Sequence, residues 1–172
     1  MFVEFKKGQP LFQAVSLVCL ATHKGNSRYP IQNVLSQGEY LVSTDGKRMH
    51  IATVPADMLA DGQYVVNKCN KTLVQLTLID GRFPVWEEII PDNGNSFGVE
   101  SPFVLGVIGI LARQNIAVSP RFVTDLDIDD ELIWTVAFEA PAPVLLSTAI
   151  DKMEFRAVLM PILFDYEKII IK

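Results

Sequence analysis

The side chains that most often carry chemistry are few in this chain of 172 residues. Its cysteines, Cys19 and Cys69, lie far apart and form no Cys-x-x-Cys pair. Its histidines, His23 and His50, share no metal-ligand spacing with each other or with the cysteines. One possible bridge is not a disulfide framework, so we expect a reduced, cytoplasmic compartment. We predict no metal site and no other cofactor.

The acidic run from Asp125 to Glu131 resembles the start of a calcium loop, because Asp stands at its first, third and fifth positions. Such a loop has Gly at its sixth position and Glu at its twelfth, where this chain has Asp130 and Val136. A solvated strand end followed by a turn explains the run better.

The sequence motifs of several common enzyme classes are missing. There is no Gly-x-x-x-x-Gly-Lys-Ser/Thr phosphate loop, no Gly-x-Gly-x-x-Gly and no Gly-x-Ser-x-Gly elbow. Asp45 and Asp80 could form a catalytic carboxylate pair, but each precedes Gly, and Asp-Gly favours turns. We predict that the protein is not an enzyme, and an enzyme with an unrecognised site stays open as an alternative.

Charge is distributed unevenly along the chain. The net charge is −5, from 15 basic and 20 acidic side chains. Residues 1–82 carry a net +3 and residues 83–172 a net −8. Proteins that hold nucleic acid by its phosphates normally show a basic stripe, which this sequence lacks. DNA contact would have to come from local clusters such as Lys6-Lys7, His23-Lys24-Arg28 and Lys47-Arg48.

Hydrophobic residues make up 49% of the chain and charged residues 20%, which is typical of a globular protein. The N-terminus lacks the order of a signal peptide. The longest nearly uncharged run, residues 101–112, is too short to span a bilayer. We expect a soluble protein with no membrane partner.

The first half of the chain predicts a short strand, one buried helix and then several strands. The strand covers residues 3–5, and the helix, apolar on most sides, covers residues 11–22. Strands are predicted at residues 31–36, 39–44, 47–54, 63–67 and 72–79. Asp45-Gly46 between two β-prone runs is a strong hairpin signal. Residues 81–91 have two prolines and no clean alternation, which indicates an ordered connector.

The second half repeats this order. Residues 92–100 are predicted as loop, and Ser101-Pro102 as the N-cap and first position of a helix that runs to about Asn115. Strands are predicted at residues 121–128, 132–138, 144–150 and 154–163. Helices set apart from antiparallel strands predict an α+β fold with two β-α-β-β-β type halves and two helices. We expect one domain over residues 1–172, with halves of about 1–92 and 93–172.

Three segments together resemble one family, the bacterial DNA polymerase III beta subunit, or sliding clamp. Residues 43–49, Ser-Thr-Asp-Gly-Lys-Arg-Met, resemble its Thr-Asp-Gly-His-Arg-Leu segment. Residues 81–91, Gly-Arg-Phe-Pro-Val-Trp-Glu-Glu-Ile-Ile-Pro, resemble its Gly-Arg-Phe-Pro-Asp-Tyr segment with the trailing Val/Ile and Pro. Residues 158–162, Val-Leu-Met-Pro-Ile, resemble its Val-Met-Pro ending. The resemblance implies a DNA clamp-like fold.

The resemblance also implies a site. In sliding clamps these segments line an apolar pocket for the short clamp-binding peptides of replication and repair proteins. Here the corresponding partner-peptide pocket would consist of Thr44, Gly46, Met49, Pro84, Ile89, Val158 and Met160. Methionine at two wall positions would give an adaptable apolar surface. The alternative is that Met49, Ile89, Val158 and Met160 are ordinary core residues.

The chain departs from the family in length and in charge. A bacterial clamp subunit has three domains, and this chain resembles the front of the middle domain joined to the back of the last. Clamp helices face DNA and carry basic side chains, whereas the second predicted helix here has Arg113 as its only charge. The possible DNA-contacting residues would be Lys6, Lys7, Lys24, Arg28 and Arg113.

Two functions follow from the resemblance. In the first, copies of the chain assemble through edge strands into a ring on DNA, with about six copies if the family's six-domain ring is kept. In the second, the chain is an interaction module that binds clamp-binding peptides without encircling DNA and competes with a true clamp. If the possible DNA-contacting residues share one concave face the first gains support, and if they scatter the second does.

Overall fold

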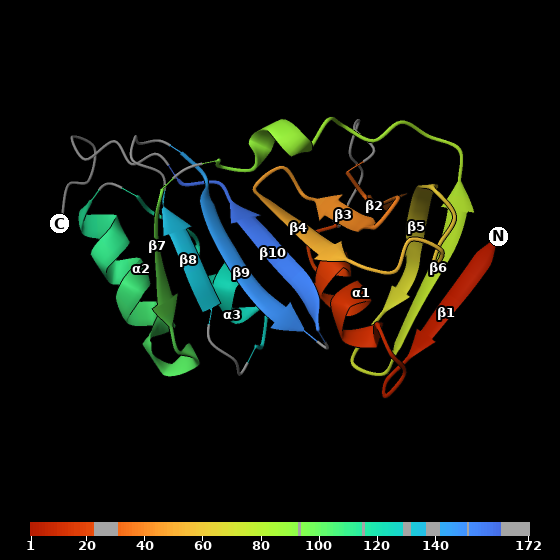
Figure 1. Ribbon diagram of the computed structural model, residues 1–172, viewed down its shortest axis with the longest axis horizontal. Coiled ribbons are helices and arrows are strands. Elements are labelled where there is room, and N and C mark those ends of the chain that lie inside the picture. Colours follow the sequence, from red (N-terminus) through yellow and green to blue (C-terminus); the bar gives the residue numbers. More distant parts are fainter. Residues whose placement is uncertain are drawn as a thin grey trace, which may run out of the picture.

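The described strands of this protein form one antiparallel sheet. The computed structural model describes residues 1–22, 31–92, 94–114, 116–128, 132–136, 142–150 and 152–162, and the ten strands in these ranges pair in the order β1-β6-β5-β2-β3-β4-β10-β9-β8-β7 (Figure 1). Their bounds are β1 Phe2–Lys6, β2 Asn33–Gln37, β3 Tyr40–Thr44, β4 Arg48–Thr53, β5 Gly62–Cys69, β6 Leu73–Ile79, β7 Asn95–Val99, β8 Leu132–Val136, β9 Val144–Ile150 and β10 Met153–Leu159. The sheet and its helices confirm the expected α+β class.

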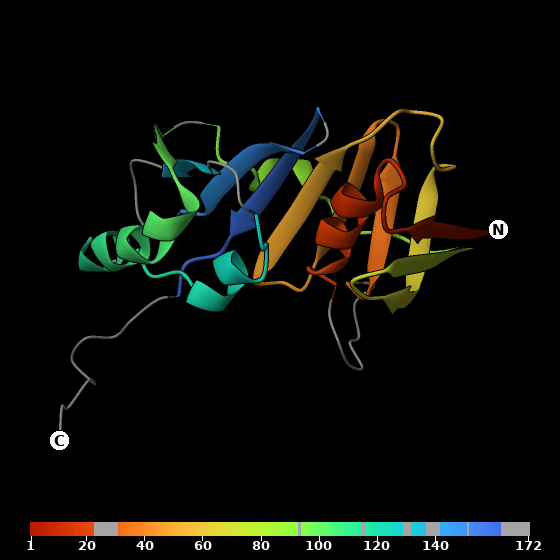
Figure 2. The same ribbon diagram turned by 90° about the horizontal axis from the view of Figure 1, so that it is seen from below.

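Short helices accompany the sheet. In the described part of the chain these are α1 Phe12–Cys19, α2 Val104–Arg113 and α3 Pro120–Thr124, with 3₁₀ turns η1 Glu87–Ile89 and η2 Ser101–Phe103. All three α-helices bury side chains in the same large core, on one face of the sheet (Figure 2). No helix among the described residues is long and apolar enough to cross a membrane.

Alternation along the central strands separates two apolar clusters. In β3, Leu41 belongs to the core under the helices, while Val42 belongs to a smaller cluster on the opposite, outer face. In β10, Phe155 packs with the helices and Val158 with the outer cluster. Because successive side chains in a strand point to opposite faces, both faces of these strands are covered. The outer cover is residues 80–92, whose Trp86 is buried in the outer cluster.

The two halves of the sheet join where β4 pairs with β10, from Arg48 opposite Leu159 to Ala52 opposite Phe155. Helix α1 packs over this region and accepts hydrogen bonds from the β3–β4 hairpin. His50, fully buried, has its Nδ1 2.6 Å from the carbonyl oxygen of Leu17. Burial lowers the pKa of His50 to about 4, so the ring is neutral near pH 7 and Nδ1–H is the donor.

The structure corrects three expectations for the second half. Residues 121–128 were expected as a strand, but Pro120–Thr124 form α3, and Val123 and Leu126, three positions apart, both face the core. Residues 92–100 were expected as loop, but Asn95–Val99 form β7. The composition of this segment gives no strand signal, and its backbone is held as a strand by pairing with β8. Ser101-Pro102 lie in η2, so α2 begins later, at Val104.

Candidate functional site

The β3–β4 hairpin turn is held by its own side chains. Thr44 Oγ1 donates to the Arg48 carbonyl at 2.8 Å and accepts from the Gly46 amide at 3.0 Å. Asp45 Oδ1 accepts from the amides of Lys47, at 2.9 Å, and Arg48, at 3.0 Å. Gly46 has φ +82°, a conformation that side-chain-bearing residues rarely adopt. The Asp-Gly signal therefore predicted a rigid turn in the right place.

The end of β10 lies directly against this hairpin. Met49 is the register partner of both Thr44 in β3 and Val158 in β10. Beyond the strand, the Met160 amide donates to the Lys47 carbonyl at 2.9 Å. Two of the three matched segments, distant in sequence, are therefore neighbours.

The third segment is the connector, which runs from the end of β6 towards β7 along the top of Figure 1 and contains η1. Trp86, 5% exposed, packs against the cluster that contains Met49 and Val158. Its Nε1 donates to Gln37 Oε1 at 3.2 Å, and its ring meets Tyr40 edge-on with 5.6 Å between centroids. The contact between the Trp86 and Tyr40 rings thus holds the connector against the strands.

Exposure divides the predicted pocket residues into a floor and a rim. Met49 and Val158 are 3% and 1% exposed and form part of the outer cluster, as the core alternative expected for them. Ile89 and Met160 are each 41% exposed, and Pro84 is also exposed. The structure brings the segments together, and peptide binding by these residues stays a prediction.

A cavity of about 410 Å³ opens beside the connector. Trp86, Tyr40 and Ile90 give it an apolar side, and Glu87 and Arg156 line it as well. The Arg156 guanidinium lies 5.9 Å from the centroid of the Tyr40 ring. The resemblance did not point to Tyr40 and Arg156, because both lie outside the matched segments. Arg156 also pairs with Glu154 of the same strand, at 3.7 Å, and no sequence signal marked it.

Arg48 ties the hairpin to two helices on the other face. Its Nε lies 3.2 Å from Asp45 Oδ2, its Nη1 3.3 Å from Asp125 Oδ2, and its Nη2 donates to the Leu20 carbonyl at 2.7 Å. The guanidinium also stacks 4.7 Å from the Phe122 ring centroid. In the Lys47-Arg48 cluster, one of those from which DNA contact could come, the Arg48 side chain is buried and its charge is paired within the protein.

The possible DNA-contacting residues that the structure describes do not lie together on one face. Lys6 and Lys7 lie at the end of the sheet that carries β1, and Arg113 ends α2 near the opposite edge strand, β7 (Figure 1). Lys6 is paired with Glu4 at 3.1 Å. Lys24 and Arg28, together with His23, lie outside the described residues. The described part of this set therefore scatters along the molecule.

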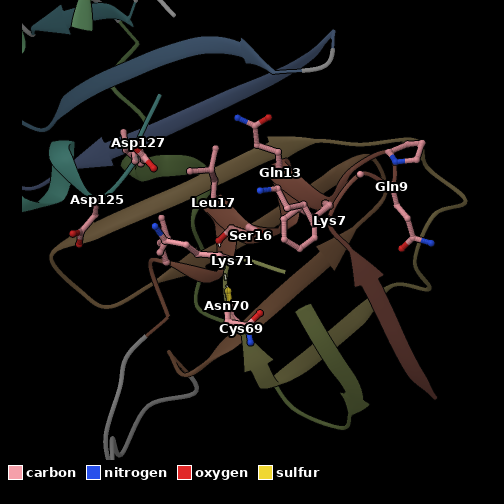
Figure 3. A pocket seen from close by; sticks show the side chains of 15 residues that line it. Lys7, Gln9, Gln13, Ser16, Leu17, Cys69, Asn70, Lys71, Asp125 and Asp127 are labelled. Carbon is pink, nitrogen blue, oxygen red and sulfur yellow. Dashed lines mark hydrogen bonds between the residues drawn. The ribbon is translucent and has the colours of Figure 1, made fainter. Parts of the chain in front are cut away.

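The helix face holds a groove of about 1000 Å³ beside α1 (Figure 3). Lys7 and Lys71 line it, as do Asp125 and Asp127 from the segment after α3. A groove that carries both acidic and basic side chains does not present the positive field that attracts a phosphate backbone. The acidic run contributes Asp125 to the Arg48 network instead of a calcium loop, and no group of three possible metal ligands occurs among the described residues.

Comparison with known proteins gives no match by sequence but several matches by structure. No protein-family model matches the chain, and no curated protein matches it. Its structure is similar to the DNA polymerase III beta subunit of Thermotoga maritima, with a TM-score of 0.62 at 13% identity. It is also similar to the DNA polymerase beta subunit of Streptococcus pyogenes, with a TM-score of 0.61 at 12% identity. The Helicobacter pylori beta clamp bound to DNA ligase peptide gives a TM-score of 0.55 at 12% identity.

These matches cover 94–95% of this chain and 66% of each of the other chains. The chain thus spans slightly less than two thirds of the length of these proteins. At such identities the similarity establishes the fold, which is that of the sliding clamps.

Proposed function

We propose that this chain, which has the fold of bacterial DNA polymerase III beta subunits, is a non-catalytic interaction platform for short peptides of replication or repair proteins. The observation that carries the proposal is the convergence of the three clamp-like segments on one outer face. The Met160–Lys47 backbone hydrogen bond joins the first and the last, and Trp86 packs the connector against both. The peptide complex of the Helicobacter pylori clamp, a protein of the same fold, supports it further.

The proposed surface suits a short, partly apolar peptide in an extended conformation. The exposed rims of Ile89 and Met160 would take apolar side chains, and the thioether can adapt to varied shapes. The surface continues past Trp86 to the cavity at Tyr40. From the Thr44–Met49 pair to the Tyr40–Thr53 pair is about 13 Å along the strands, the length of roughly four extended residues.

Peptide titration tests this function. The probe is a DNA ligase peptide of the kind bound in the Helicobacter pylori clamp complex, and binding is followed through the intrinsic fluorescence of Trp86 and Trp134. We expect a Kd in the micromolar range, and Met160→Asp should weaken binding at least ~10-fold because it places a charge in the apolar rim. Ile133→Asp is the matched control, since Ile133 is also an exposed apolar residue, in β8. No binding at high micromolar peptide, or equal effects of both variants, would refute the proposal.

The second candidate is a ring built from copies of this chain. It is favoured by one observation: in the described sheet, β1 and β7 each pair on one side only, which leaves an open edge at either end. Head-to-tail pairing of such edges can close a ring. The scatter of Lys6, Lys7 and Arg113 speaks against a DNA-gripping lumen. Light scattering decides the assembly, because a monomer at all concentrations and salt conditions excludes the ring.

A further inference from the structure

The two cysteines, unrelated by any sequence motif, face the same side of the sheet. Cys69 is the last residue of β5 and pairs in register with Val74 of β6. Val74 is fully buried in the core beneath the helices. Register partners in an antiparallel pair share a face, so the Cys69 side chain is directed toward the helix side.

Cys19 lies in helix α1, the helix that the Cys69 side chain faces. It is the last residue of this helix, one turn after Ser16, whose carbonyl oxygen lies 4.0 Å from Cys69 Sγ (Figure 3). The neighbouring Cys69 side chain, together with burial, raises the pKa of the Cys19 thiol well above its ordinary value. Both side chains therefore lie at the last turn of α1 on the helix side of the sheet, and a disulfide between them would bring their sulfur atoms to ~2.05 Å.

The pair is asymmetric in its access to solvent. Cys19 is 3% exposed, whereas Cys69 is exposed and lines the groove beside α1 (Figure 3). Lys7 and Lys71 line the same groove, as do Asp125 and Asp127. A small reagent can reach one sulfur directly, and the other only through the first.

We propose that Cys69 and Cys19 form a thiol–disulfide modification site that reacts with small anionic disulfides of the oxidised glutathione class. The Cys69 thiol loses its proton and attacks one sulfur of the small disulfide, whose S–S bond breaks and releases one small thiol. The Cys19 thiol then loses its proton and attacks the Cys69 sulfur of the mixed disulfide, releasing the second small thiol. The protein is oxidised by two electrons, and the small disulfide is reduced to two thiols.

The product would fasten α1 to the end of β5. The last turn of α1 already receives hydrogen bonds from His50, Ser43 and Arg48 of the central hairpin. A covalent bond closing so long a loop restricts the unfolded chain, and we expect the midpoint of thermal unfolding to rise by roughly 5–10 °C. Oxidation would therefore stiffen the helix that supports the hairpin.

The experiment equilibrates the full chain with oxidised and reduced glutathione and maps its peptides under non-reducing conditions. We expect a Cys19–Cys69 crosslinked peptide within one chain, the rise in the melting midpoint, and reversal of both by dithiothreitol. Cys69→Ser should abolish the crosslink and the shift. Cys19→Ala should leave a stable glutathione adduct on Cys69.

Contrary outcomes are equally distinct. A wild-type chain that accumulates only the glutathione adduct on Cys69, or only disulfides between chains, overturns the proposal. So does a wild-type crosslink without a change in melting midpoint. Cys69→Ser alters an exposed position, so it keeps the test decisive even if Cys19→Ala, in the core, fails to fold.

Discussion

The two faces of strands β4 and β10 are covered in different ways. On the helix face, α1 lies over a continuous core that includes Phe155 and Leu159. On the outer face, a single connector covers a small cluster built around Trp86, and apolar rims at Ile89 and Met160 remain exposed. One face holds the fold together, whereas the other leaves apolar surface available to a partner. Under the proposed function, stability and peptide recognition would lie on opposite sides of the same strands.

The largest expected effect comes from removing an aromatic ring on the helix face. Phe155→Ala should lower the free energy of unfolding by about 3–5 kcal/mol, because Phe155 is 1% exposed and packs edge-on against His50. Urea unfolding measures this loss. A cost below about 1 kcal/mol would mean that the helix-face core is not the main source of stability.

Lowering the pH should reduce the free energy of unfolding through protonation of His50, which is buried on the helix face. Its pKa falls from 6.5 to about 4 on folding, mainly by burial. The unfolded state therefore binds the proton first, and stability present above pH 6.5 is lost as the pH falls toward 4, by about 3 kcal/mol in total. Urea midpoints between pH 7.5 and pH 4 follow the loss. His50→Gln should flatten this part of the profile, and an unchanged slope would contradict the assignment.

Replacing an aromatic residue by Ala on the outer face should lower the free energy of unfolding by less than it does on the helix face, and it should also weaken peptide binding. Trp86→Ala is expected to lower the free energy of unfolding by about 2 kcal/mol, because the connector can detach while the sheet stays folded. Peptide affinity should fall at least ~10-fold, since Trp86 anchors the connector. Hydrogen exchange should increase in residues 80–92 alone. Loss of protection throughout the sheet would erase the distinction between the two faces.

The smallest effect is expected at Arg121. It lies 3.5 Å from the same Asp125 carboxylate that Arg48 holds, but its side chain is 80% exposed, against 9% for Arg48. Arg121→Met should change the free energy of unfolding by less than about 0.5 kcal/mol. The matched variant Arg48→Met should cost several times more, because it leaves Asp45 and Asp125 without their shared cation. Equal costs in parallel urea titrations would show that burial does not distinguish the two pairs.

Local signals predicted the first half of the fold well. The hairpin at Asp45-Gly46 and helix α1 lie where turn chemistry and apolar periodicity placed them. The same signals failed at α3 and β7. A five-residue helix offers too few periods to be distinguished from a strand, and β7 owes its conformation to hydrogen bonds with β8.

For the candidate site, residue types identified the three segments, and only the fold showed that they lie next to one another in space. Thr44, Met49 and Met160 could be named from short matches, but no local pattern revealed that Met49 lies between Thr44 and Val158. Nor did sequence distinguish Lys47-Arg48 as one free and one engaged cation. The partners of Arg48 come from the turn, from α1 and from the segment after α3.

The amino-acid sequence by itself determined the alternation, the turns and the absence of a basic stripe, because these depend on neighbours only a few residues apart. Tertiary structure decided which face each alternating side chain meets, which charges are neutralised within the protein, and that Cys19 and Cys69 face the same side of the sheet. Those outcomes depend on strand register and on helix placement, which are set by burial summed over the whole sheet rather than by any one segment.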